Sequence, residues 1–347
     1  MSDVLIRQTG HLGHVTLNRP KAINALTHGM VRDIHSALLT WKDDPSVTVI
    51  LIDGEGERGF CAGGDIAAIY QSARSHDGTA AQFWREEYPL NALISRYPKP
   101  YVALMHGIVM GGGVGLSAHG LFRIVTGTSR IAMPEVGIGF VPDVGGLHLL
   151  SRAPGELGAY LGLTGAPMKA VDAILCGFAD CCVNAEFLPQ VIQNIAECHR
   201  AEDVAAAIRS VASAPPPGEL ADKRAWIDAC FRHESIEDIL AALDAHSNAD
   251  AHATAAIIRK QSPTSLKVTL RGLRSARSQS LAECLKMEFR MAVATTLHHD
   301  LAEGIRAAVI DKDRQPKWRP ATLDDVSPAL VASHFAAPAG GDLDLPE

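Results

Sequence analysis

The sequence predicts an α/β domain followed by a region made only of helices. Short apolar runs typical of strands alternate with helical patterns over the first half of the chain. Two of the strand-to-helix junctions are rich in glycine, and the strand pattern fades after about residue 190. The alternation is typical of helices packed on a sheet. The clearest linker, residues 213–218 (SAPPPG), divides the chain into residues 1–212 and 213–347.

The first domain is expected to open with strands and helices in turn. Strands are predicted at residues 4–8, 13–17, 47–52, 101–105 and 122–125, and helices at 27–41, 65–73 and 80–95. Thr27 is expected to cap the first helix because its hydroxyl can accept a backbone N–H of the first turn. Helical spacing in the second region predicts helices at 201–212, 221–230, 235–246, 249–260, 279–292 and 299–306.

Composition and charge exclude several classes of protein. The chain has 347 residues, of which 47% are hydrophobic and 20% charged, which excludes a disordered chain. The net charge of −7 leaves no basic excess to neutralise a nucleic acid. No apolar run is long enough to predict a membrane span. The seven cysteines lack paired spacing and the start is unlike a signal peptide, so we expect reduced thiols and a cytoplasmic location.

A literal GxGxxG motif stands at residues 54–59. A dinucleotide site would need a helix to open there and point its N-terminus at the pyrophosphate. Here Asp53, Glu55 and Glu57 would repel that anion, and the next helical pattern begins only near Asp65. We therefore interpret the motif as a glycine turn and not as an NAD site.

Two other glycine-rich junctions are better candidates for chemistry. Residues 60–65 (FCAGGD) lead into one helix, and glycines 111–113 open another after an apolar strand. Glycine lets backbone N–H groups approach a ligand without a Cβ atom in the way. Two such junctions can supply the two preorganised donors that an oxyanion hole requires. The alternative is close packing of helix on sheet.

Two carboxylates, Glu135 and Asp143, stand in an otherwise apolar, glycine-rich segment. Burial there would raise their pKa values and suit them to acid–base or nucleophilic work. The alternatives are that Asp143 caps a helix over residues 144–151 and that Glu135 lies on the surface. The sequence has no GxSxG, HExxH or Walker A motif, and the adjacent His298 and His299 cannot share one helix face as metal ligands.

These segments together resemble the enoyl-CoA hydratase/isomerase (crotonase) superfamily. The resemblance spans about residues 5–320 and rests on residues 18–26 (NRPKAINAL), 60–66 (FCAGGDI), 106–115 (HGIVMGGGVG) and 134–135 (PE). Within the superfamily the sequence is most similar to thioester hydrolases that act on short branched 3-hydroxyacyl-CoA. That similarity rests on residues 85–88 (REEY), 142–146 (PDVGG), 262–267 (SPTSLK), 303–307 (EGIRA), 310–313 (IDKD) and 316–318 (PKW).

The resemblance implies a crotonase-like spiral of ββα units that binds an acyl-CoA substrate, with no cofactor apart from the coenzyme A of the substrate. By matching motifs, the backbone N–H groups of Gly64 and Gly112 would form the oxyanion hole. Glu135 would be the catalytic glutamate, and Asp143 and Glu87 would line the pocket. The implied coenzyme A-binding residues are Lys21, Ala22, Ala62, Gly63, Asp65 and Ile66.

One departure separates this chain from the hydratases of that superfamily, which carry a second glutamate where this sequence has Gly115. Asp143 supplies a different second acid, so the resemblance favours thioester hydrolysis without a metal. Whether Glu135 attacks the thioester or activates water is left open. The alternatives are a hydratase or isomerase, and a homologue that binds acyl-CoA without turnover. The helical region could also support a homo-oligomer.

Overall fold

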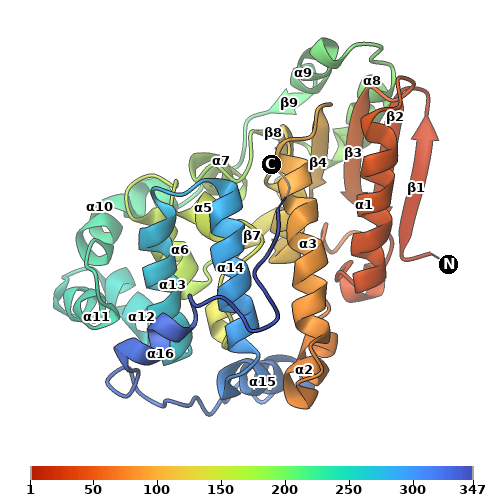
Figure 1. Cartoon of the computed structure of the whole chain (residues 1–347). Coiled ribbons are helices and arrows are strands. Elements are labelled where there is room, and N and C mark those ends of the chain that lie inside the picture. Colours follow the sequence, from red (N-terminus) through yellow and green to blue (C-terminus); the bar gives the residue numbers. More distant parts are fainter. Residues whose placement is uncertain (1, 346–347) are drawn as a thin grey trace. The chain divides into compact units, whose positions relative to one another are not determined.

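The computed structural model describes residues 2–345 and divides into two compact units (Figure 1). Unit 1 consists of Met1–Gly64, Pro89–Ala132 and Met168–Gly218. Unit 2 consists of Asp65–Tyr88, Met133–Pro167 and Glu219–Glu347. Each unit is thus assembled from separate segments of the chain, and the linker predicted at 213–218 lies at the end of the last segment of unit 1.

Unit 1 contains a seven-stranded sheet in the order β1-β2-β3-β4-β6-β8-β9. Its strands are β1 (Val4–Thr9), β2 (Leu12–Leu17), β3 (Val49–Gly54), β4 (Tyr101–Met105), β6 (Phe122–Val125), β8 (Cys181–Val183) and β9 (Ala212–Ser213). The strands from β2 to β8 pair in parallel, and the two edge strands pair antiparallel to their neighbours. All five residues of β4 are buried, as expected of a parallel strand covered on both faces.

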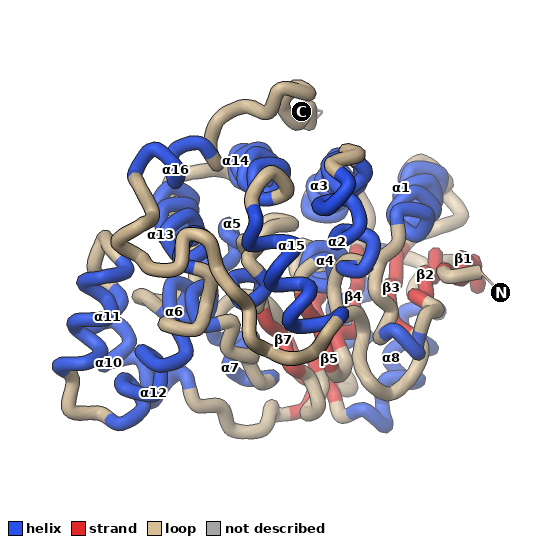
Figure 2. Tube along the Cα trace, turned by 90° about the horizontal axis from the view of Figure 1, so that it is seen from below, coloured by secondary structure: helices blue, strands red, loops and turns tan. Residues whose placement is uncertain are grey.

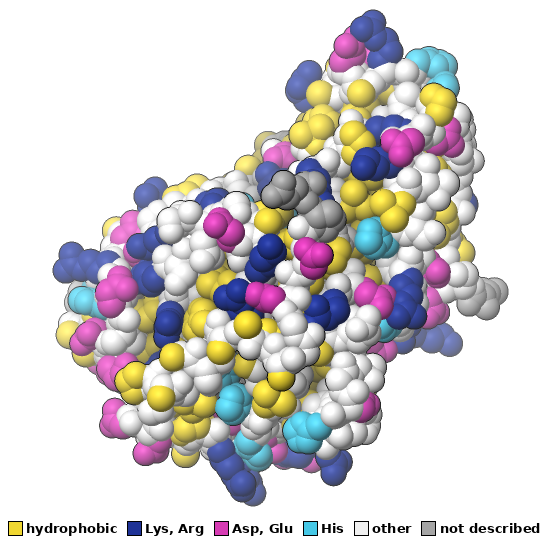
Figure 3. Space-filling model, viewed as in Figure 1, with side chains coloured by type: hydrophobic (Ala, Val, Ile, Leu, Met, Phe, Trp, Pro, Cys, Tyr) yellow, Lys and Arg dark blue, Asp and Glu magenta, His cyan; other side chains and the backbone are white. Residues whose placement is uncertain are grey.

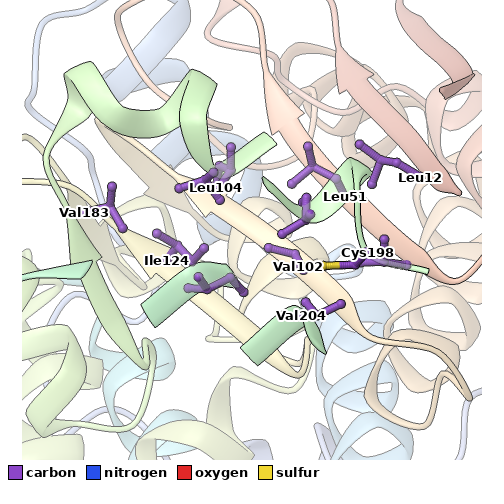
Figure 4. Packing of buried hydrophobic residues seen from close by; sticks show 12 residues of the cluster. Leu12, Leu51, Val102, Leu104, Ile124, Val183, Cys198 and Val204 are labelled. Atoms are coloured by element: carbon purple, nitrogen blue, oxygen red, sulfur yellow. The ribbon is translucent and has the colours of Figure 1, made fainter. Parts of the chain in front are cut away.

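Helices cover both faces of this sheet (Figure 2). Helix α1 (His28–Lys42) lies on one face, and α8 (Leu188–Ala196) lies on the other. Residues of α9 (Val204–Arg209) pack in the same apolar cluster as those of α8. On the second face, strand residues such as Leu51 and Val102 pack against helix residues such as Val204 (Figure 4). Successive strand side chains point to opposite faces of the sheet, so the side chains on each face pack against the helices that cover it.

The rest of unit 1 positions the glycine-rich segments. A two-stranded parallel sheet joins β5 (Ile108–Met110) to β7 (Arg130–Ala132). The remaining helices of this unit are η1 (Pro20–Ala22), α4 (Gly112–Ser117), α7 (Ala170–Leu175), η3 (Ala185–Phe187) and η4 (Ala201–Asp203). Helix α3 (Thr79–Ser95) begins in unit 2 and ends in unit 1.

Unit 2 is made of helices. They are α2 (Ile66–Ser75), η2 (Glu135–Ile138), α5 (Gly146–Leu150), α6 (Leu157–Thr164), α10 (Leu220–Phe231), α11 (Ile236–Ala245), α12 (Ala249–Ile258), α13 (Pro263–Ala276), α14 (Leu281–Thr295), α15 (His299–Ile305), the π-helical η5 (Arg306–Ile310) and α16 (Pro328–Ser333). Helix α13 lies at the centre of the unit, where α5, α6, α14 and α16 all pack against it. Helix α15 packs against α2 and η2.

The five predicted strands and the predicted N-cap of α1 are confirmed. Thr27 Oγ1 accepts a hydrogen bond from Met30 N–H at 3.3 Å. No helix among residues 2–345 combines the length and the apolar composition needed to cross a bilayer. On the face drawn in Figure 3, basic and acidic side chains are interspersed, which limits the electrostatic field of either sign.

Candidate active site

The two glycine-rich junctions of unit 1 lie next to each other. Met110 N–H donates a hydrogen bond to Cys61 O at 3.0 Å, so the chain that leads to Gly64 runs beside strand β5. A Cβ atom on Gly63 would lie 3.3 Å from Met110 O and 3.7 Å from Gly112 N. The two predicted junctions therefore form one feature of unit 1, and a side chain at position 63 would crowd the start of α4.

Both junctions present backbone donors. The chain at Gly63 is fixed by Leu26 N–H, which donates to Gly63 O at 2.8 Å. Gly112 is the first residue of α4, and its N-cap, Gly111, has a left-handed φ of 47°. Within residues 2–345, neither Gly64 N–H nor Gly112 N–H donates a hydrogen bond to another residue. Unpaired N–H groups of this kind can stabilise a developing oxyanion.

The GxGxxG segment is held as a turn by one buried side chain. Asn24 is fully buried, and its Nδ2 donates to the backbone oxygens of Glu55, Gly59 and Phe60 at 3.1, 3.2 and 3.0 Å. No helix opens at this loop, because α2 begins only at Ile66. The interpretation of the motif as a glycine turn is therefore confirmed.

The residues expected to bind coenzyme A lie in both units. Lys21 and Ala22 are exposed in η1 of unit 1, and Ala62 is half-buried in the glycine-rich loop of the same unit. Asp65 is the N-cap of α2 in unit 2, and Ile66 is the first residue of that helix. Their role in binding remains a prediction.

Unit 2 gathers carboxyl groups in its interior. Glu87 comes from α3, Glu135 from η2, Asp143 from the turn before α5, and Glu288 from α14. These side chains are 2%, 6%, 5% and 0% exposed. The alternative in which Glu135 lies on the surface is therefore wrong. Buried carboxyl groups are rare unless paired or functional, so this acid cluster is the strongest candidate for chemistry in unit 2.

Glu135 is held at the start of the short helix η2. Gly139 ends that helix with a left-handed φ of 71°. A Cβ atom on Gly139 would lie 2.2 Å from Asp300 O, so only glycine allows this close approach to α15. The Trp84 and Phe140 rings stack with their centroids 5.2 Å apart and pack the chain just after η2. The glycine-rich sequence thus reflects tight packing around a fixed glutamate.

The members of the cluster differ in their hydrogen bonds. Tyr88 OH donates to Asp143 Oδ2 at 2.7 Å. Within the described chain, Glu135 Oε2 and Glu87 Oε1 are buried without a hydrogen-bond partner. A buried polar atom without a partner is costly to keep. The two unpartnered oxygens are therefore available to a ligand.

Burial changes the ionisation of these groups. Burial raises the pKa of Glu135 well above its usual value, and the charge of Asp143 raises it further. The pKa of Glu87 is raised by the same two causes. Burial raises the pKa of Asp143 to about 7, although the hydrogen bond from Tyr88 opposes the rise. A carboxyl group that titrates near neutrality can serve as base or acid at physiological pH.

The backbone turns sharply after Asp143. Val144 and Gly145 both have left-handed φ values, 54° and 80°, and Gly146 N–H donates to Asp143 O at 2.6 Å. Positive φ is a genuine outlier for a β-branched residue, and such strain costs on the order of 1–3 kcal/mol. Helix α5 has Gly145 as its N-cap, without a side-chain cap. The alternative in which Asp143 caps this helix is therefore wrong, since Asp143 accepts from Tyr88.

Sequence reasoning assigned no role to Tyr88 or Glu288. Tyr88 belongs to the family motif at residues 85–88, and Glu288 lies among the charged residues of the helix predicted at 279–292. The signal for Glu288 was present, because it lies on the same face of α14 as Cys284, Leu285 and Ala292, all buried. A glutamate in the middle of an apolar stripe indicates a buried partner.

Relatives cover nearly the whole chain. The 3-hydroxyisobutyryl-CoA hydrolases, named mitochondrial, of Xenopus tropicalis and Danio rerio are 41% and 42% identical to it, over 99% of this chain and 91% and 92% of their own. A crystal structure described as a carnitinyl-CoA dehydratase from Mycobacterium thermoresistibile is 50% identical with a TM-score of 0.94, covering 98% of both chains. An enoyl-CoA hydratase structure from Rhodobacter sphaeroides 2.4.1 is 43% identical with a TM-score of 0.91, over 99% and 100% of the chains.

One expectation is contradicted by these relatives. The vertebrate hydrolases are named mitochondrial proteins, so the cytoplasmic location expected from the sequence is wrong. All seven cysteines are free thiols. Free thiols argue only against an oxidising compartment, which is why they could not separate the cytoplasm from another reducing one.

The comparisons confirm the predicted fold class, a crotonase-like α/β fold with a C-terminal helical region. The model of the family described as enoyl-CoA hydratase/isomerase matches residues 12–335. With this match and curated relatives above 40% identity over nearly the full length, the chain belongs to the enoyl-CoA hydratase/isomerase family.

Proposed function

We propose that the protein hydrolyses the thioester bond of 3-hydroxyisobutyryl-CoA and releases 3-hydroxyisobutyrate and coenzyme A, a step of valine degradation. The observation that carries the proposal is the pair of buried carboxyl groups of Glu135 and Asp143 in unit 2. One oxygen of Glu135, Oε2, has no hydrogen-bond partner in the described chain. Curated hydrolases of this name, about 40% identical over nearly the whole chain, support it.

The reaction consumes one water molecule. A C–O bond forms at the thioester carbonyl carbon, the C–S bond breaks, and the thiolate of coenzyme A receives a proton. These steps need a base or nucleophile, an acid, and donors for the carbonyl oxygen. Glu135 and Asp143 would divide the first two roles, because both pKa values are raised and one group can hold the proton that the other lacks.

The glycine junctions of unit 1 would stabilise the negative charge on the carbonyl oxygen. The donors would be Gly64 N–H and Gly112 N–H, which are free to bind a ligand within the described chain. We assign Glu87 to the pocket that receives the acyl group, since its buried Oε1 also lacks a partner. Coenzyme A would bind through the loops at residues 21–22 and 62–66.

A second candidate function is hydration or dehydration at a carbon–carbon double bond. Two solved structures similar to this chain are described as a dehydratase and a hydratase. The residue at position 115 argues against this function, because Gly115 can neither activate water nor deliver a proton to carbon. Hydrolysis uses the acid that the chain does carry, Asp143.

Release of free thiol from a panel of acyl-CoA thioesters tests the proposal. We expect thiol release from 3-hydroxyisobutyryl-CoA in the presence of a chelator, since the mechanism needs no metal and no cofactor beyond the substrate's coenzyme A. Loss of the enoyl chromophore from an enoyl-CoA without thiol release would instead show a hydratase. Binding of acyl-CoA with neither signal would show a homologue without turnover.

A further inference from the structure

We propose that Tyr88 and Glu288 are positioning residues that hold Asp143 in place, Tyr88 through its hydroxyl and Glu288 through the strained turn that follows Asp143. The inference rests on the proposed catalytic role of Asp143. All three residues lie in unit 2.

Tyr88 fixes the carboxyl group of Asp143 directly. Its hydroxyl donates to Asp143 Oδ2 at 2.7 Å, and both side chains are buried. The Tyr88 ring meets the Phe289 ring edge-on, with centroids 6.3 Å apart and planes at 86°. Because the ring is packed against α14, the hydroxyl cannot swing away without opening the interior of the unit.

Glu288 fixes the backbone on the other side of Asp143. Its Oε2 accepts a hydrogen bond from Gly145 N–H at 2.7 Å, and its Oε1 accepts one from Leu147 N–H at 2.9 Å. The left-handed Val144 lies between Asp143 and Gly145, the first of these two donors. A strained backbone persists only where its surroundings over-determine it, and the Glu288 carboxylate supplies two of the required bonds.

The same two residues act on ionisation in opposite directions. The hydroxyl of Tyr88 lowers the pKa of Asp143, whereas the charge of Glu288 raises the pKa of Glu135. Glu288 is itself buried, which raises its pKa, while its two backbone donors favour its charged form. The titratable groups that interact electrostatically with Asp143 or Glu288 are Glu87 and Tyr88 on α3, Glu135 on η2, and Cys284 on α14.

Tyr88→Phe and Glu288→Gln test the proposal, with two readouts. The first is kcat and KM with 3-hydroxyisobutyryl-CoA, where we expect kcat to fall by up to about 10²-fold with little change in KM, as for a misplaced reacting group. The second is titration of the side-chain carboxyls by ¹³C NMR, with signals identified by their loss in Asp143→Asn and Glu135→Gln. Tyr88→Phe should raise the titration midpoint of Asp143, and Glu288→Gln should lower that of Glu135.

Matched controls separate positioning from general damage. Tyr97→Phe removes another tyrosine hydroxyl hydrogen bond, the partly buried one to Leu38 O at 2.7 Å, and Glu283→Gln changes an exposed glutamate of α14. Both controls should keep the wild-type kcat and the wild-type midpoints.

Folded variants with wild-type kcat and unshifted midpoints would overturn the proposal. If Glu288→Gln does not fold, the kcat of Tyr88→Phe and the titration midpoint of Asp143 in that variant test the proposal. If the wild-type protein cleaves no acyl-CoA thioester, the proposed function fails. The NMR midpoints then still decide whether Tyr88 and Glu288 control the acid cluster.

Discussion

The glycine junctions of unit 1 and the acid cluster of unit 2 present two different kinds of chemical group. The junctions present backbone N–H groups. Their placement depends on the φ of 104° at Gly63 and on the close approach to Met110 that the missing Cβ atom of Gly63 allows. The cluster presents carboxyl groups, whose chemistry depends on ionisation and on hydrogen bonds such as that from Tyr88.

Substitutions and changes of pH should affect the glycine junctions and the acid cluster in different ways. Backbone donors carry no titratable charge, so they are lost through crowding or strain and not through pH. Buried carboxyl groups lose function when one proton is gained or one charge removed. Substitutions in the two regions should therefore differ in their pH dependence even where they lower turnover by similar factors.

The largest expected effect belongs to Glu135→Ala. We expect kcat to fall by about 10²–10⁴-fold, the range for removing a positioned acid or base. Stability should change little, because one Glu135 oxygen is buried without a partner in the described chain, and the charges that shift its pKa are those of two other carboxyl groups, Asp143 and Glu288. Turnover measurements and thermal melts check both points, with the exposed Glu186→Ala as control. A variant that keeps more than about a tenth of the wild-type kcat would remove Glu135 from the mechanism.

Asp143→Asn should lower kcat by a similar factor, about 10²–10⁴. The amide keeps the size of the side chain and can still accept from Tyr88 OH, but it cannot hold the negative charge. Affinity for a non-hydrolysable acyl-CoA analogue should change much less than turnover. Normal turnover would leave Glu135 as the sole supported catalytic carboxyl and would favour another activity of the family.

Much of unit 1 was predictable because its strands are apolar runs between helical patterns. The short strands β5, β7, β8 and β9 escaped prediction, since two or three residues are too few to show alternation. Helix α13 also escaped prediction, because residues 263–276 contain polar side chains such as Thr269 that are nevertheless buried. Burial of this kind is set by packing partners from distant segments, which local pattern cannot show.

The candidate site was predictable in its residue types but not in its internal hydrogen bonds. Glu135 and Asp143 stood out as charges in an apolar segment, and burial confirms that signal. The bond from Tyr88 to Asp143 joins residues 55 positions apart, and those from Gly145 and Leu147 to Glu288 join residues more than 140 apart. Without an observed contact, the sequence offered no reason to pair them.

Gly63→Ala should have a smaller effect and one of a different kind. Gly63 has a φ of 104°, and the added Cβ would lie 3.3 Å from Met110 O, so the donors at the junction should shift. We expect kcat to fall by up to about 10²-fold, with a pH profile parallel to that of the wild type. Gly78→Ala is the matched control, because Gly78 has a φ of 76° with no atom within 4 Å of the added Cβ. A changed pH profile in Gly63→Ala would contradict the division between the two regions.

The last expected effect is on the pH dependence of stability and not on turnover. Burial raises the pKa of Asp143 from 3.8 to about 7 in the folded protein, so between these values the folded state holds a proton that the unfolded state has released. The free energy of unfolding then falls as pH rises. The contribution of Asp143 to stability is fully present below about pH 3.8 and is lost as pH passes about 7.

Asp143→Asn has no carboxyl group to titrate at this position, so its stability should not fall in this way. Its stability relative to the wild type should therefore improve between pH 4 and pH 7, as denaturant unfolding at a series of pH values would show. Ser235→Ala, which removes the half-buried N-cap of α11, should instead be destabilised by about 0.5–2 kcal/mol at every pH. An Asp143→Asn offset as constant as that of Ser235→Ala would mean that Asp143 is ionised throughout, and would exclude it as the group that holds a proton near neutrality.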